Sequence, residues 1–186
     1  MRKDSDLLAE QYFHLHIRIG VLRSKACAAL SAFSQSADVR LAPTPFSIVY
    51  QKDRIQLNHY HSMESIRHSV QTPLLIVYAL INRETILDLQ TNQSVVQRLL
   101  DEGLDLYMIR WGDPAYNDRY LTIGDHVIGY INDAVDCIRN RCGVRRLNLM
   151  GICMGGTFSV MYAALYPEKV KNLVTTVTPI NFDTQA

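Results

Sequence analysis

The chain has 186 residues, of which 48% are hydrophobic and 20% charged, with a formal net charge of +1 at pH 7. This apolar content is enough for one sizeable core, so we expect one domain or part of one. Because basic and acidic residues nearly balance and form no basic run, the charge pattern excludes nucleic acid and anionic membrane surfaces as expected partners.

The absence of a recognisable targeting signal and the pattern of cysteines predict a soluble protein of the cytoplasm. The N-terminal residues MRKDSDLLAEQ lack the features of a secretory signal, and no apolar run approaches the roughly 20 residues that span a bilayer. The four cysteines form no CxxC pair, and disulfides are unusual in a reducing cytosol. Cys27, Cys137 and Cys142 are interpreted as structural or incidental, which leaves Cys153 to be explained.

The first segment, from about Asp6 to Phe33, has the spacing of an amphipathic helix. Its apolar residues recur in steps of four and three: Leu8, Tyr12, Leu15, Ile19, Leu22 and Ala26. We favour a stripe that packs against the rest of the fold, although the same spacing suits a coiled-coil seam with a partner. The next residues, SQSADVRLAPTP at 34–45, are small, polar and proline-containing, and predict a linker.

The rest of the chain predicts strands that alternate with helices. FSIVYQKDRIQLNHY indicates a hairpin, and four apolar strands follow, in PLLIVYAL, LDLYMIRW, RLNLMG and VKNLVTTVTPI. Between them lie helical patterns, with Thr122 as a cap, Gly103 and Gly143 as stops, and one long stripe: Ile123, Val127, Ile131, Ala134 and Ile138. This order predicts an α/β fold with a doubly wound, mostly parallel sheet.

The sequence GICMGG, at 151–156, lies between the third of these strands and the helix after it. It fits a strained strand-to-helix turn that exposes its central side chain, with Gly151, Gly155 and the adjoining Gly156 giving the backbone room. The positive end of the new helix favours the thiolate of Cys153. We interpret Cys153 as a nucleophile; the alternative is a small buried residue that fills a gap in the turn.

An oxyanion hole is also expected near this elbow. One N–H would come from Met154, the residue after the nucleophile, and the second from a loop after an earlier strand. That loop is ALINRET, in which Leu80 or Ile81 could supply the N–H. Asn82 either orders the loop or caps the next helix, and capping is the favoured role. We expect no metal site.

Several stretches together resemble the polyhydroxyalkanoate synthases of the two-subunit type, which are α/β-hydrolase-like. They run from about Pro43 to the chain end and include TPFSIVYQKDRIQLNHY, VYALINRETILDLQ, MIRWGDP, LTIGDHVIGYINDAVD and LNLMGICMGGTFSVMYAALYPEKVKNLVTTVTPINF. The most specific element is the elbow cysteine, since ordinary hydrolases of this fold carry serine there, and the family's nucleophile matches Cys153. We therefore assign residues 1–42 to a helix and linker and residues 43–186 to the N-terminal part of a catalytic domain.

The resemblance implies an acyltransferase that polymerises 3-hydroxyacyl groups from coenzyme A thioesters and uses no cofactor. Thiolate attack exchanges one thioester for another, so the acyl group stays activated for transfer to a hydroxyl. Water must be kept out if the product is polymer, which predicts an apolar pocket around Cys153. The implied partners are 3-hydroxyacyl-coenzyme A, a second helical subunit, the polyester granule surface and, in an oligomer, further copies of the chain.

Two features depart from the family's pattern. Enzymes of this fold carry the acid and histidine after the nucleophile, whereas all six histidines precede Cys153. The sequence is therefore expected to stop before the lid and the acid and histidine half, and Asp183 is interpreted as a loop residue. His126 with Asp125 is interpreted as a solvated pair at a helix start. Arg110 stands where the family usually has aspartate, and the reversed charge could disturb the site.

Two alternatives to the acyltransferase stay open at this point. A thioesterase or other hydrolase of the same fold would differ only in letting water reach the acyl-enzyme. A non-catalytic remnant is the second alternative, because the expected general base is missing. In either case the last predicted strand would be an unpaired apolar edge, from which we expect association with other chains.

Overall fold

The computed structural model describes residue 25 and residues 42–62 and 70–183. The chain divides into two units between Arg40 and Leu41, and the sheet lies in the second, residues 41–186. The predicted helix from Asp6 to Phe33, with Cys27, and most of the predicted linker lie outside the described residues. Across the described part of the chain, every helix is too short or too polar to cross a bilayer.

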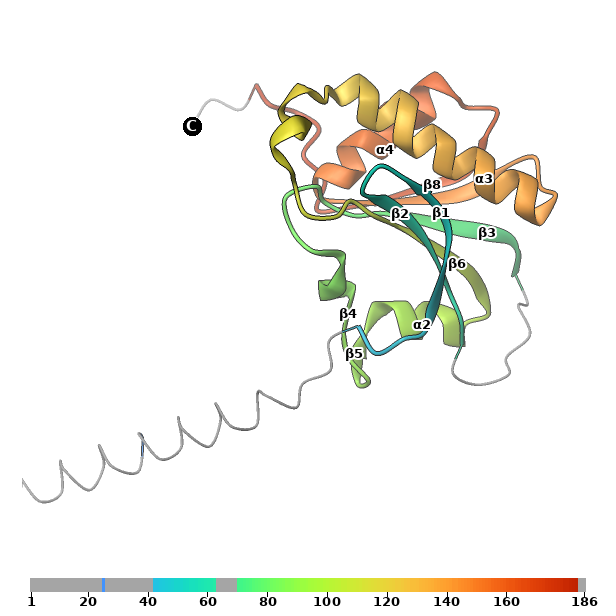
Figure 1. The fold of residues 1–186 in the computed structure, drawn as a ribbon. Coiled ribbons are helices and arrows are strands. Elements are labelled where there is room, and N and C mark those ends of the chain that lie inside the picture. Colours follow the sequence, from blue (N-terminus) through green and yellow to red (C-terminus); the bar gives the residue numbers. More distant parts are fainter. Residues whose placement is uncertain (1–24, 26–41, 63–69, 184–186) are drawn as a thin grey trace, which may run out of the picture. The chain divides into compact units, whose positions relative to one another are not determined.

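A mostly parallel sheet of six strands forms the centre of the described part of the second unit (Figure 1). Its strands are β1 (Phe46–Lys52), β2 (Ile55–Tyr60), β3 (Val70–Val77), β6 (Leu104–Arg110), β7 (Leu147–Ile152) and β8 (Val170–Thr176). They lie side by side in the order β1-β2-β6-β3-β7-β8, in which β2 is antiparallel to both of its neighbours and the other adjacent strands are parallel. The predicted hairpin and the four predicted strands are confirmed. A separate small ribbon pairs β4 (Asp88–Gln90) with β5 (Gln93–Ser94).

Helices cover both faces of this sheet, as the doubly wound fold requires. The π-helical segment η3 (Asp125–Ile131), its continuation α3 (Asn132–Cys142), and α4 (Met154–Leu165) pack on one face, and α2 (Val95–Asp101) packs on the other (Figure 1). Successive side chains of a strand point to opposite faces. In β3, Leu75 and Val77 therefore join the first core, while Leu74 and Ile76 join the second. The 3-10 helices η1 (Glu84–Leu87) and η2 (Tyr116–Tyr120) lie in the connecting loops.

The helix that contains η3 begins at its predicted cap but is wound differently from the prediction. Thr122 Oγ1 accepts a hydrogen bond from Asp125 N, and Asp125 accepts one from Thr122 N at 2.7 Å. Gly143 ends the helix with φ 64°, as predicted. The predicted stripe is wrong at Ile123, which is 58% exposed. Ile123 lies in the first turn of the helix, where it borders an apolar hollow together with Val127.

The end of the predicted linker is part of the folded unit. Thr44 is only 2% exposed, and both its backbone N–H and its hydroxyl donate to the carboxylate of Asp88, at 3.0 and 2.9 Å. The hydroxyl of Ser94 donates to the same buried carboxylate at 2.6 Å. A buried carboxylate is stabilised when such donors replace its water. The prediction of a linker through residue 45 is therefore wrong for Thr44.

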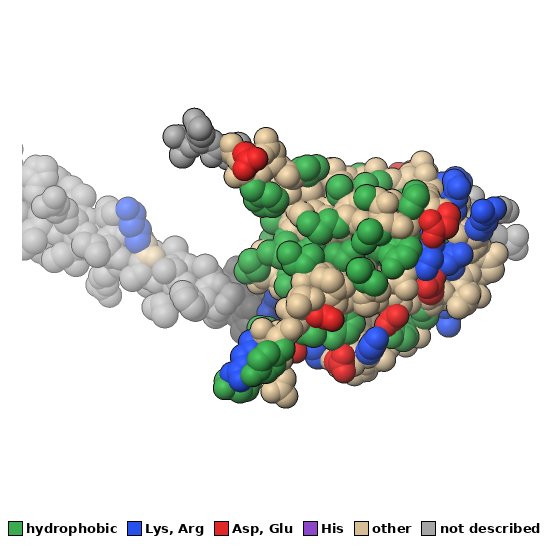
Figure 2. All heavy atoms as spheres, turned by 90° about the horizontal axis from the view of Figure 1, so that it is seen from above, with side chains coloured by type: hydrophobic (Ala, Val, Ile, Leu, Met, Phe, Trp, Pro, Cys, Tyr) green, Lys and Arg blue, Asp and Glu red, His purple; other side chains and the backbone are tan. Residues whose placement is uncertain are grey.

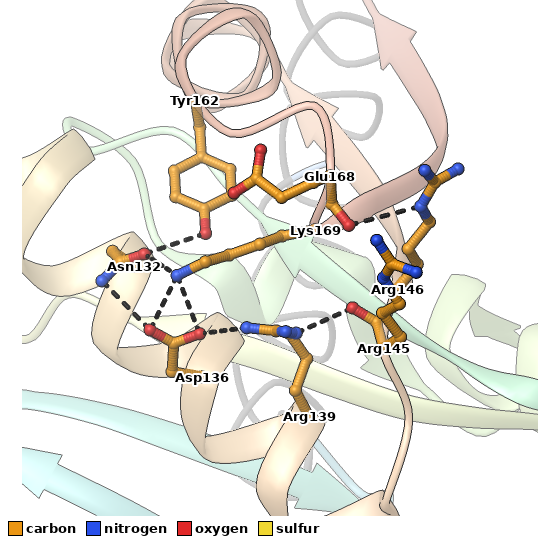
Figure 3. A network of polar contacts seen from close by, with 8 residues as sticks. All are labelled: Asn132, Asp136, Arg139, Arg145, Arg146, Tyr162, Glu168 and Lys169. Atoms are coloured by element: carbon orange, nitrogen blue, oxygen red, sulfur yellow. Dashed lines mark hydrogen bonds and ion pairs between the residues drawn. The ribbon is translucent and has the colours of Figure 1, made fainter.

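A polar network holds α3 against α4 and the turn that leads to β8 (Figure 3). Lys169 Nζ donates to Asn132 and to Asp136, each at 2.8 Å, and Tyr162 also donates to Asn132. Burial acts to raise the pKa of Asp136, but hydrogen bonds and charges from Lys169 and Arg139 outweigh it and hold that pKa below its ordinary value. This stabilisation is present above the ordinary carboxyl range and is lost as the pH falls through the lowered pKa.

Strand β8 forms one edge of the sheet in the described part of the chain. It pairs with β7, and side chains along it, including Leu173 and Val174, are exposed. An apolar edge strand offers unpaired backbone groups to another chain. The sequence predicted this edge, and the association that would follow from it stays a prediction.

Candidate active site

Cys153 occupies a strained turn where β7 meets α4. Its φ of 54° and ψ of −127° are unfavourable for a residue with a side chain, and such a backbone persists only where the surrounding structure enforces it. The N–H of Cys153 donates to Thr176 O at 2.9 Å, and its carbonyl accepts from Gly156 N at 2.8 Å. The Cys153 side chain is exposed. The predicted elbow is therefore present, and the alternative of a buried gap-filling cysteine is wrong.

The three glycines of the elbow lie where a side chain has no room. A Cβ on Gly155 would clash with the backbone at the end of β3, 2.5 Å from the carbonyl oxygen of Tyr78. A Cβ on Gly151 would lie 2.6 Å from Ser159 Oγ, and one on Gly156 would meet the side chain of Thr178. These glycines let α4 pack directly on β3, so the elbow comes close to the loop that follows β3.

The two predicted second donors of the oxyanion hole lie in different surroundings. Leu80 and Met154 line one cavity together with Cys153, whereas Ile81 is 85% exposed. The oxyanion role of all three residues stays a prediction. Asn82 accepts a hydrogen bond from the next backbone N–H, and the helix η1 has Arg83 at its cap position without a side-chain cap. Asn82 therefore orders the loop, and the favoured capping role is wrong.

Cys153 opens onto a cavity of about 480 Å³ whose walls are largely apolar. They come from the loop after β3, the start of η3, the α4 helix and the segment after β8: Leu80, Leu121, Thr122, Ile123, His126, Cys153, Met154, Thr157, Phe158, Met161, Pro179 and Phe182. An adjoining apolar hollow shares Ile123 and Met161 with it. Figure 2 shows hydrophobic side chains gathered on this face of the molecule. The predicted apolar pocket around Cys153 is confirmed.

His126 is the site residue that the sequence misplaced. It is 6% exposed, lines the same cavity as Cys153 and lies among three aromatic rings, those of Trp111, Tyr130 and Phe158. The interpretation of His126 and Asp125 as a solvated pair is therefore wrong for His126, since only Asp125 is exposed. A signal was available, because His126 adjoins the buried stripe at Val127 and precedes Tyr130 by one helical turn.

Two aromatic residues at the ends of β3 and β6 support the site. Trp111 is buried and donates its indole N–H to Tyr78 O at 2.9 Å, which links the two loops that follow these strands. Burial raises the pKa of Tyr78, and the negative charge of an ionised Cys153 raises it further. The Tyr78 phenol therefore stays protonated when the thiolate is present.

The charge reversal at Arg110 is balanced locally. Arg110 Nε lies 3.2 Å from a carboxylate oxygen of Glu84, which follows the same loop as Leu80. A second ion pair joins Arg83 to Asp113 at 2.9 Å. Each arginine thus has its own acidic partner at this edge of the sheet. In the described ranges, no three potential metal ligands lie together.

We expect Cys153 to react with iodoacetamide faster than Cys137 or Cys142. Cys153 is exposed, while burial raises the pKa of both other thiols and keeps them protonated at neutral pH. Peptide mass mapping after a brief treatment should find the label at Cys153 first. Slower labelling of Cys153 than of Cys137 would contradict the elbow assignment.

Comparison with known proteins finds two family matches that overlap along the chain. Residues 72–185 match the α/β hydrolase fold family. The chain belongs to this family. Residues 21–99 match the N-terminal region of poly-beta-hydroxybutyrate polymerase. This member of the α/β hydrolase fold family therefore also has the predicted resemblance to polyhydroxyalkanoate synthases.

Curated relatives of this α/β hydrolase include three poly(3-hydroxyalkanoate) polymerase subunits named PhaC. The protein from Haloferax mediterranei is 47% identical over 162 residues, which cover 87% of this chain and 32% of the relative. Those from Synechocystis and Allochromatium vinosum are 45% and 48% identical, over 78% and 76% of this chain. The chain covers 38% and 40% of these two relatives, so it spans well under half the length of all three.

Solved structures agree on the fold alone. The Francisella virulence factor BioJ superposes with a TM-score of 0.58 at 14% identity, over 87% of this chain and 52% of that protein. A bacterial membrane phospholipase A gives 0.52 at 21% identity, over 98% of this chain and 55% of its own. At such low identity these matches support the α/β hydrolase fold and carry no statement about substrate.

Proposed function

We propose that this chain, which has the α/β hydrolase fold, is part of an acyltransferase that forms polyhydroxyalkanoate. In this proposal Cys153 accepts the 3-hydroxyacyl group from coenzyme A. The observation that carries the proposal is a cysteine, exposed at a strained elbow, at the edge of an apolar cavity. The resemblance to polymerase subunits supports the choice of substrate.

The chemistry begins with attack of the Cys153 thiolate on the thioester carbonyl carbon. The carbonyl electron pair moves to oxygen, where the N–H groups of Met154 and Leu80 would stabilise the oxyanion. We favour Leu80 over Ile81 because Leu80 lines the cavity. When the tetrahedral intermediate collapses, the bond from carbon to the coenzyme A sulfur breaks, and coenzyme A leaves and takes up a proton. The acyl group is then a thioester of Cys153, ready for attack by a 3-hydroxyl group.

The surroundings of Cys153 favour transfer to a hydroxyl over hydrolysis. Phe158, Met161 and Phe182 form apolar walls beside the reacting sulfur. Such walls accommodate an acyl chain and make a poor environment for water. The same argument supports the granule surface as a partner, because apolar side chains of the adjoining hollow, such as Ile128 and Leu165, are exposed.

The other partners of the proposed enzyme follow from the relatives. The relatives are named as subunits, which supports a second subunit as partner. The proposed reaction needs no cofactor, because the thioester itself supplies the activated acyl group.

We expect incubation with 3-hydroxybutyryl-coenzyme A to leave one 3-hydroxybutyryl group on Cys153. Intact mass measurement followed by peptide mapping detects the adduct and its position. Cys153→Ala should abolish it, reducing the labelling to background, whereas Cys137→Ala should leave it unchanged. Release of free 3-hydroxybutyrate at the same rate as coenzyme A would indicate a hydrolase, and an adduct at another cysteine would refute the proposed role of Cys153.

A further inference from the structure

The hydrogen bonding of His126 determines which of its ring nitrogens is free to accept. Nδ1 lies 2.8 Å from the backbone carbonyl oxygen of Thr122. A carbonyl oxygen can only accept, so Nδ1 carries the proton, and in the neutral ring Nε2 holds a lone pair. Among the described residues, no hydrogen bond reaches Nε2 of His126. An acceptor is therefore available on a ring that lines the cavity.

The hydroxyl groups of the cavity wall already donate their protons within the protein. Thr157 donates its hydroxyl to Pro179 O at 2.7 Å, and Thr122 donates its hydroxyl to Asp125 at 2.7 Å. The remaining walls of the cavity are apolar apart from the thiol of Cys153. A hydroxyl group that entered this cavity would lose its hydration and would need an acceptor there. Nε2 of His126 can supply one.

His126 is also not bonded to the sulfur atom of Cys153 in the described structure. In the described structure no hydrogen bond joins Cys153 Sγ to His126, although the two side chains line the same cavity. An acyl group carried on Cys153 would thus occupy the space that His126 borders. The position suits a residue that contacts the bound acyl group more than one that acts on the thiol.

We propose that Nε2 of His126 accepts a hydrogen bond from the 3-hydroxyl of the bound acyl group, so that His126 selects 3-hydroxyacyl thioesters over unsubstituted ones. This inference rests on the proposed function, since it takes an acyl thioester as the ligand. It adds a residue that determines specificity. A site built to pair with a substrate hydroxyl discriminates against the analogue that lacks it, because the site's own acceptor is then left unpaired.

The test measures binding without acyl transfer, in the Cys153→Ala variant. Calorimetric titration compares 3-hydroxybutyryl-coenzyme A with butyryl-coenzyme A. We expect the hydroxylated ligand to bind about 3- to 10-fold more tightly, as one neutral hydrogen bond allows. Adding His126→Phe should reduce this ratio to about one and leave the affinity for butyryl-coenzyme A unchanged. His126→Gln keeps an acceptor and should retain part of the preference.

The exposed histidine at position 61 provides the matched control. His61→Gln should leave the ratio unchanged. Should His126→Phe fail to fold, nitrogen NMR of the histidine rings in Cys153→Ala gives an independent measurement. The hydroxylated ligand should shift the Nε2 resonance of His126, and butyryl-coenzyme A should shift it much less. An equal response to the two ligands, an unaltered ratio in the folded His126→Phe protein, or no binding of either ligand would overturn the proposal.

Failure of this inference is distinguishable from failure of the proposed function. If Cys153 takes up acyl groups from both thioesters equally well and Cys153→Ala shows no binding preference, the acyltransferase stands and the role of His126 falls. If Cys153 is never acylated while Cys153→Ala still prefers the hydroxylated ligand through His126, the binding role stands and the acyltransferase falls.

Discussion

When it is supplied with 3-hydroxybutyryl-coenzyme A, the 186-residue chain should release about one equivalent of coenzyme A for each Cys153 and then stop. This result is expected if the acyl group stays on Cys153 and is not transferred to a hydroxyl group. Enzymes of this fold place the acid and the histidine after the nucleophile, and no histidine follows Cys153 in this sequence. General acid and base catalysis contributes about 10²–10⁴-fold. Supplying the C-terminal portion of a relative, fused or as a separate piece, should raise the rate of coenzyme A release by about this factor and yield polymer.

The control for this experiment is Cys153→Ala, which should abolish both the first equivalent and the restored turnover. The rate is followed as free coenzyme A, and the polymer is identified separately. Sustained release by the chain alone would contradict the argument from chain order. A histidine before Cys153 would then act as the base, and His126, which lines the cavity, would be the first to replace.

Gly155→Ala should destabilise the fold and slow the acylation of Cys153. The added Cβ would clash with carbonyl oxygens at the end of β3, and backbone atoms cannot turn aside as a flexible side chain can. Overpacking of this kind costs about 1–3 kcal/mol of the free energy of unfolding. Acylation should fall further, about 10²-fold, because α4 must move away from β3 and misplace the reacting sulfur. Urea unfolding and the rate of adduct formation measure the two effects.

Gly129→Ala is the matched control for this substitution. Gly129 lies in η3, and a Cβ built on it meets no heavy atom within 4 Å. Alanine is favoured over glycine inside a helix by about 1 kcal/mol, so this variant should be at least as stable as the wild type. If Gly155→Ala matched Gly129→Ala in stability and in acylation rate, the close packing of α4 on β3 would be needed neither for the stability of the fold nor for the reaction of Cys153.

The strands and the elbow could be predicted because their signals are local. The four apolar runs from Pro73 onward became β3, β6, β7 and β8, of which the first three lie inside the sheet and β8 lies at its edge. The glycines around Cys153 marked a turn that residues with side chains cannot form. Ile123 and Thr44 were predicted wrongly, because the burial of a helix end and the docking of a loop depend on distant partners.

Part of the cavity was also readable from the sequence. Thr157 and Met161 lie four residues apart, so they share one face of α4, and both line the cavity with Cys153. His126 and Phe182 joined the site from other segments, and no spacing in the sequence relates them to Cys153. The ion-pair partner of Arg110 could not be predicted either, because Glu84 lies on a different loop and no spacing in the sequence relates the two residues.

The sequence by itself determined the strand order in the chain, the strained elbow and the cysteine at its centre. These follow from the volume of side chains and from hydrophobic periodicity, which act between neighbours in the chain. Only the tertiary structure decided that His126 lines the same cavity as Cys153 and that its Nδ1 is held by Thr122. The reason is that the surroundings of a histidine are set by the helices and loops that pack around it, which here include Trp111 after β6 and Phe158 on α4.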